Sequence, residues 1–172
     1  TYFLITMLLI GLICLYQLNV YTWFVAISAI PLIILYPLAK RFIKWPQIIL
    51  GLTFSWAVPT AWSAANEEWN LGIFIMYLAT VFWIIGYDTI YGCQDKNEDE
   101  IFGIKNSAVS AKNFLTLFVG CSYSLMFCLL IISGYLLNNN IFWYIGVSIC
   151  GLHLSYQVIK IKNIEQNNPL QI

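Results

Sequence analysis

Six stretches of about 17 to 23 residues carry almost no charge and are apolar on every side of a helix. They cover residues 2–18, 20–39, 47–64, 71–91, 114–136 and 141–158. A helix needs about 20 apolar residues to cross roughly 30 Å of hydrocarbon, so each stretch can span a membrane. A transmembrane β-barrel would show short segments that alternate apolar and polar residues, and these segments do not alternate. The pattern predicts an all-α membrane protein, a bundle of about six transmembrane helices.

The composition supports a membrane protein with one domain. Hydrophobic residues make up 60% of the chain and charged residues only 9%, whereas soluble domains carry about 25% charged residues. No linker, low-complexity tract or clear repeat divides the sequence, so residues 1–172 are interpreted as a single transmembrane domain. Pro31, Pro37 and Pro59 fall within or near spans, where neighbouring helices can satisfy the freed carbonyls, and we expect kinks there. No motif indicates binding to nucleic acid.

The basic residues predict how the bundle is oriented. All of them follow the second, fourth or sixth stretch, and the other connections have none: Lys40, Arg41, Lys44, Lys96, Lys105, Lys112, Lys160 and Lys162. With alternating helices, these three segments lie on one face, which the positive-inside rule assigns to the cytoplasm.

Acidic residues gather at the end of the fourth stretch. The segment YDTIYGCQDKNEDEIFGIKNSA, residues 87–108, holds five of the eight carboxylates of the chain. If the helix continues past Gly86, then Asp88, Tyr91, Asp95 and Asp99 follow steps of three and four and share one helical face. Such a column needs positive charge beside it, either basic side chains or a hard cation such as Mg²⁺. A solvated charge run without function is the alternative.

A second polar group lies on the same predicted face. The segment YPLAKRFIKWPQIILG brings Lys40, Arg41 and Lys44 to the end of the second stretch. Taken alone, these cations are explained by membrane topology. Paired with carboxylates on the same face, they indicate a site for a phosphorylated ligand.

Four motifs in this order resemble one family. YPLAKR, PQIILG, YDTIYGCQDKNEDE and GIKNSA are similar to the UbiA superfamily of intramembrane prenyltransferases, and within it to the enzymes that act on 4-hydroxybenzoate. Members of the family transfer a polyprenyl group from its diphosphate to an aromatic ring. They use Mg²⁺ and two aspartate-rich motifs on the cytoplasmic side of nine helices.

The resemblance implies a role for several residues. Asp95 and Asp99 match the second aspartate-rich motif and would hold Mg²⁺ on the diphosphate, with Lys40 and Lys105 on its oxygens. Arg41 would bind the carboxylate of the aromatic acid, and Asp88 would lie near its phenol. Tyr36 and Tyr91 would stabilise an allylic cation through their rings.

The resemblance also implies substrates and a location. Polyprenyl diphosphate and 4-hydroxybenzoate would be the substrates, in ubiquinone biosynthesis. The enzyme would be multi-pass in a bacterial or mitochondrial inner membrane, with its site facing the cytoplasm or matrix. Nothing in the chain matches the first aspartate-rich motif, so we expect a partial chain that lacks about two helices before it and one after it, and that is inactive alone.

Two alternatives remain open. One is another UbiA-type aromatic prenyltransferase, from the menaquinone, haem or tocopherol pathway. The other is a transporter or non-enzymatic bundle, in which intramembrane acids line an ion path. Here the acids lie at the end of a span rather than at its middle, which disfavours a transporter.

Overall fold

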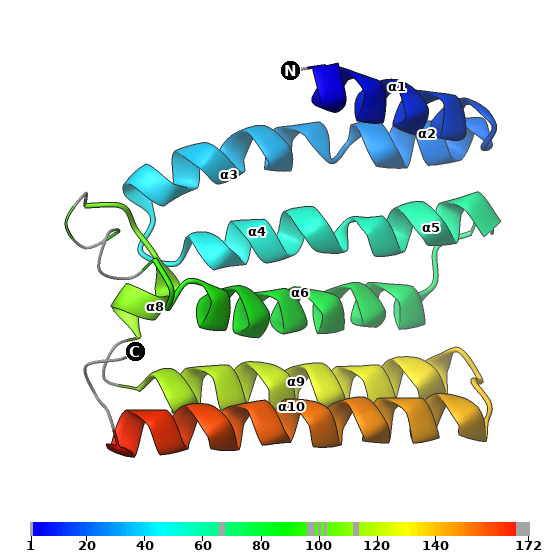
Figure 1. The fold of residues 1–172 in the computed structure, drawn as a ribbon. Coiled ribbons are helices and arrows are strands. Elements are labelled where there is room, and N and C mark those ends of the chain that lie inside the picture. Colours follow the sequence, from blue (N-terminus) through cyan, green and yellow to red (C-terminus); the bar gives the residue numbers. More distant parts are fainter. Residues whose placement is uncertain are drawn as a thin grey trace.

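The chain folds into helices throughout the part that the structure describes. The structure is a computed structural model, and it describes residues 2–65, 68–95, 99, 101, 103–111 and 114–167, with side chains as far as residue 163. Figure 1 shows the helices in chain order: α1 Tyr2–Tyr16, α2 Val20–Ile27, α3 Ile30–Phe42, α4 Pro46–Ser55, α5 Ala57–Ala65, α6 Leu71–Tyr91, α8 Ser107–Ser110, α9 Leu115–Leu136 and α10 Ile141–Asn167. The all-α prediction is confirmed.

Within these residues, five helical segments are long and apolar enough to cross a membrane. They are Val20–Phe42, Pro46–Ala65, Leu71–Tyr91, Leu115–Leu136 and Ile141–Asn163. The first predicted span, residues 2–18, is instead a shorter apolar helix of 15 residues. It ends because Asn19 caps the next helix: its side chain accepts a hydrogen bond from the Thr22 backbone N–H at 2.8 Å, as N-cap residues do.

Two of the five spans contain a break near a proline. Pro31 lies in the first turn of α3 and Pro59 lies in α5, and neither has a backbone N–H to donate. The Val25 carbonyl, near the end of α2, accepts hydrogen bonds from Ser28 Oγ at 2.6 Å and from Trp56 Nε1 at 2.8 Å. Trp56 lies between α4 and α5, so one break helps to satisfy the other in a medium without water.

The spans lie side by side in a row. The α6 helix packs between the α4–α5 segment and α9, while α10 contacts α9 and the α2–α3 segment contacts α4–α5 (Figure 1). The ends of α3, α6 and α10 and the starts of α4 and α9 therefore share one end of the row, as the charge pattern predicted. We call it the polar end. Lys96, Lys112 and residues 168–172, which also entered that prediction, lie outside the described residues.

The closest packing in the row joins α6 to α9 at Gly86. A methyl group at Gly86 would come within 2.5 Å of the Tyr123 ring, and Tyr123 is itself buried. Glycine is therefore required at this position for the two helices to approach, in the way that small residues permit close helix contacts in membranes. Gly86 stands two residues before Asp88, so this contact also positions the polar end of α6.

We expect Gly86→Ala to destabilise the purified protein by about 1–3 kcal/mol, the usual cost of overpacking. The added methyl group must push Tyr123, and with it α9, away from α6. Thermal unfolding in detergent measures the loss. Gly146→Ala is the matched control, because a methyl group there meets no atom within 4 Å. Equal melting temperatures for the two variants would contradict the packing described here.

Candidate active site

The polar end of the bundle brings together three segments that are distant in the sequence. They are the last turns of α3, the start of α4, and the end of α6 with the segment that follows it through α8 (Figure 1). The Lys105 backbone N–H donates to the Lys40 carbonyl at 2.9 Å, and Ser110 Oγ donates to the Lys44 carbonyl at 2.8 Å. The basic and acidic motifs of the sequence therefore form one site.

The four residues expected on one helical face do not share a helix. The α6 helix ends at Tyr91, with Gly92 as its C-cap, so Asp88 and Tyr91 lie in its last turn while Asp95 and Asp99 lie beyond it. The Gly92 carbonyl accepts a hydrogen bond from Asn106 Nδ2 at 3.0 Å, and a methyl group at Gly92 would come within 2.7 Å of the same amide. The packed Asn106 side chain therefore takes the place of the next helical turn, and the prediction of one continuous column is wrong.

Lys40 is the cation that lies among the carboxylates. Its side chain interacts with Asp88 and with Asp99, and its Nζ atom lies 5.3 Å from the centre of the Tyr36 ring. That distance is typical of a cation–π contact. The expectation that packing brings a basic residue to the acidic segment is borne out at Lys40.

Other predicted site residues are exposed at the same end. The Arg41, Tyr91, Asp95 and Lys105 side chains are all exposed, and Lys40 and Arg41 form the basic last turn of α3. Cations there favour the negative end of the helix dipole. The structure thus gathers these residues at one end of the bundle without packing their side chains together.

Two buried amides that the sequence did not single out connect the carboxylates. Gln47 and Asn106 are 4% and 5% exposed. Asn106 Nδ2 donates to Asp99 Oδ2 at 2.7 Å, and Gln47 Nε2 donates to Asn106 Oδ1 at 3.1 Å. The Gln47 side chain also interacts with Asp88. Both residues stand within motifs of the family resemblance, PQIILG and GIKNSA, but only a buried location separates them from ordinary surface amides.

A polar groove of about 610 Å³ opens beside Asp99. Lys44 and Lys105 line it together with Asp99, Asn106 and Ser110. Two ammonium groups next to a carboxylate suit an anionic ligand that shares a metal with the protein. Lys44 was predicted only as one of three cations near the site, and the groove gives it a location beside Asp99.

The residues present fit a shared magnesium site. Among the described residues, no three His, Cys, Asp or Glu side chains form a metal-binding group. Mg²⁺ does not need such a group, because it is commonly held by one or two carboxylates, water and substrate phosphates. Asp99 beside the groove, with Asp95 one helical turn before it and joined to it by a backbone hydrogen bond of 2.8 Å, supplies that kind of donor.

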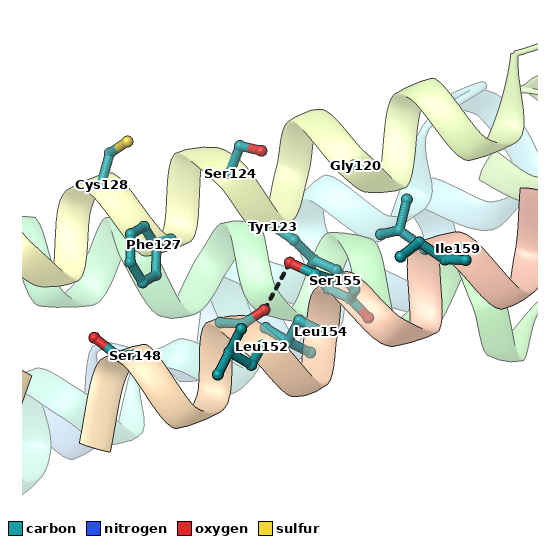
Figure 2. Close-up of a pocket in the computed structure, with 12 residues that line it drawn as sticks. Gly120, Tyr123, Ser124, Phe127, Cys128, Ser148, Leu152, Leu154, Ser155 and Ile159 are labelled. Carbon is teal, nitrogen blue, oxygen red and sulfur yellow. Dashed lines mark hydrogen bonds between the residues drawn. The ribbon is translucent and has the colours of Figure 1, made fainter. Parts of the chain in front are cut away.

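The largest groove of the described chain lies elsewhere. It is a space of about 750 Å³ between α9 and α10, lined by residues such as Tyr123, Phe127 and Leu152, and Figure 2 shows it with Ser155 bonded to its own helix. Its lining is mostly apolar and lies within two membrane-spanning segments. The groove is away from the carboxylates, so its size does not make it the reactive site.

Five apolar spans with cations, carboxylates and buried amides at one end define a multi-pass integral membrane protein with a polar site at the membrane surface. Residues 1–171 match the UbiA prenyltransferase family, and the chain belongs to that family.

Curated relatives are similar over most of this chain. It is 42% identical over 148 residues to the 4-hydroxybenzoate octaprenyltransferase of Francisella tularensis subsp. novicida (strain U112), covering 86% of this chain and 52% of that protein. It is 38% identical over 158 residues to the mitochondrial 4-hydroxybenzoate polyprenyltransferase of Dictyostelium discoideum, covering 89% of this chain and 33% of that protein. The chain thus spans about half or less of these relatives. No solved structure matches it.

Proposed function

We propose that this chain forms part of a Mg²⁺-dependent enzyme that transfers a polyprenyl group from polyprenyl diphosphate to the ring of 4-hydroxybenzoate, in ubiquinone biosynthesis. The observation that carries the proposal is the position of Lys40 between Asp88 and Asp99 at the polar end of the bundle. The relatives are named for this chemistry. They are also longer, and we call a protein of their length that contains these residues the complete enzyme.

The polar end supplies groups that suit a diphosphate leaving group. Breaking the allylic carbon–oxygen bond leaves the electron pair on the diphosphate, and Lys40 and Lys105 are placed to stabilise that charge. Asp95 and Asp99 would hold Mg²⁺, which when bound neutralises part of the diphosphate charge. These assignments rest on the family motif and on the groove beside Asp99.

The remaining roles concern the aromatic acceptor and the carbocation. Arg41 would pair with the carboxylate of 4-hydroxybenzoate, and Asp88 would lie near its phenol. The rings of Tyr36 and Tyr91 would face the allylic cation until the ring carbon beside the hydroxyl forms the new bond and loses its proton. Apolar helices on either side limit the access of water to the cation.

The test of the proposed function is a transfer assay. Membranes that contain the complete enzyme are incubated with labelled 4-hydroxybenzoate and a polyprenyl diphosphate, with and without Mg²⁺. We expect a prenylated product that requires the metal. Product formed only from the aromatic acceptors of the menaquinone, haem or tocopherol pathways would replace this acceptor, and ion flux without any product would favour a transporter.

The site is proposed to face the cytoplasm, or the matrix in a mitochondrion, from an inner membrane. The basis is the distribution of lysine and arginine, which the positive-inside rule relates to orientation. An introduced cysteine at Asn139, at the opposite end of the bundle, should react with an impermeant thiol reagent added outside cells, while one at Lys44 should not. The reverse labelling would overturn the orientation.

A further inference from the structure

We propose that Gln47 and Asn106 form a positioning bridge, an amide pair that holds Asp99 at a fixed place relative to Asp88 and so joins the diphosphate half of the site to the aromatic half. The inference rests on the proposed function, because it assigns the two amides to the geometry of that reaction. Neither amide is proposed to touch a substrate.

The Asn106 side chain has no spare hydrogen-bonding capacity. Its two Nδ2 hydrogens go to Asp99 Oδ2 at 2.7 Å and to the Gly92 carbonyl at 3.0 Å. Its Oδ1 atom accepts from Gln47 Nε2 at 3.1 Å and from the Ala108 N–H at 2.9 Å. An asparagine amide offers two donors and two main acceptor positions, so all four are used. Rotation of the amide by half a turn would break all four bonds.

Gln47 continues the bridge toward Asp88. Its Oε1 atom accepts from the Ser107 backbone N–H at 2.9 Å, which orients the amide so that Nε2 faces Asn106. Nε2 carries two hydrogens, and the Gln47 side chain interacts with the Asp88 carboxylate as well as with Asn106. Two amides therefore link carboxylates on α6 and on the segment after it.

Burial gives this arrangement its rigidity. Both amides are nearly inaccessible to solvent, and Ser107 is completely buried. A fully bonded polar network in a low-dielectric interior is costly to disturb, because each broken bond leaves an unpaired buried group. The Asp99 carboxylate, by contrast, lines the open groove beside Lys44 and Lys105. A buried support under an accessible carboxylate is the arrangement that positions metal ligands in other proteins.

Two isosteric variants of the complete enzyme test the bridge. Asn106→Asp keeps an acceptor for Ala108 and Gln47 but places an oxygen against the Asp99 carboxylate. Gln47→Glu keeps the acceptor for Ser107 and removes the donor to Asn106 and Asp88. We expect the Mg²⁺ concentration for half-maximal transfer to rise about 10- to 100-fold in Asn106→Asp, the range for residues that support metal ligands. In Gln47→Glu we also expect a higher KM for 4-hydroxybenzoate.

A binding measurement separates this inference from the proposed reaction. Mg²⁺ with inorganic pyrophosphate should raise the melting temperature of the complete enzyme, and Asn106→Asp should shift that titration to higher Mg²⁺ by a similar factor. The titration requires no turnover and no aromatic substrate. If the parent protein makes no product, the proposed function fails while this titration still decides the bridge.

The control variant removes a different buried hydrogen bond. Ser133 is completely buried, and its Oγ donates to the Gly72 carbonyl at 2.8 Å between α9 and α6 at the opposite end of the bundle. Ser133→Ala should lower the melting temperature without moving the Mg²⁺ titration. If Asn106→Asp does not fold, Asn106→Ser replaces it, because serine can still cap α8 but is shorter than asparagine. An unchanged Mg²⁺ midpoint in a folded Asn106 variant would overturn the bridge and leave Asn106 as a helix cap.

Discussion

Asp99→Ala in the complete enzyme is expected to reduce prenyl transfer by two orders of magnitude or more. Loss of one group that stabilises developing charge commonly costs about 10²–10³ in kcat. Asp99 lines the groove with two lysines and is held by a buried amide, so its removal takes a proposed metal ligand and leaves Asn106 Nδ2 with one bond fewer. Asp95→Ala should act in the same direction. The measurement is initial transfer rate at saturating and at limiting Mg²⁺.

Two comparisons make the Asp99 result specific. Glu68→Gln changes a carboxylate on the other side of α6 in the sequence, in the connection before the helix, and should leave the rate unchanged. Arg41→Ala should raise the KM for 4-hydroxybenzoate more than the Mg²⁺ requirement, because Arg41 is assigned to the carboxylate of the acid. A near-parental rate in Asp95→Ala and Asp99→Ala would refute the metal assignment.

The 172-residue chain, expressed by itself, is expected to give no detectable prenyl transfer. A diphosphate carries several negative charges, and the family resemblance implies metals held by two aspartate-rich motifs, of which the chain contains one. In the described residues the helices form an open row rather than a closed ring, with α2–α3 and α10 each packed on one side only. Charge stabilisation and protection of a carbocation from water should therefore both fail.

The test compares the purified chain with the complete enzyme in the same transfer assay. Binding of Mg²⁺ or pyrophosphate to the short chain can survive, since Asp95, Asp99 and Lys105 are present. Circular dichroism and thermal unfolding establish that the short chain is folded, so that inactivity is not simply misfolding. Mg²⁺-dependent product at a rate close to that of the complete enzyme would show that these residues are sufficient.

The sequence by itself determined the class of fold and the end of the bundle that carries the chemistry. A long apolar run without charge has few stable options other than a membrane helix, because its length and hydrophobicity are local properties. Helix order then places every second connection at the same end, so Lys40 and the acidic segment had to meet there. The sequence also predicted kinks at Pro31 and Pro59, where the structure places helix breaks.

Only the tertiary structure decided how the site is built. The spacing of Asp88, Asp95 and Asp99 fits a continuous helix equally well, and the chain leaves that helix because Asn106 packs against Gly92. The amide of Gln47 reaches Asn106 across 59 positions of sequence, and no local pattern encodes that pairing. Hydrogen bonds between buried side chains depend on which helices pack together, and that is set by contacts such as Tyr123 on Gly86.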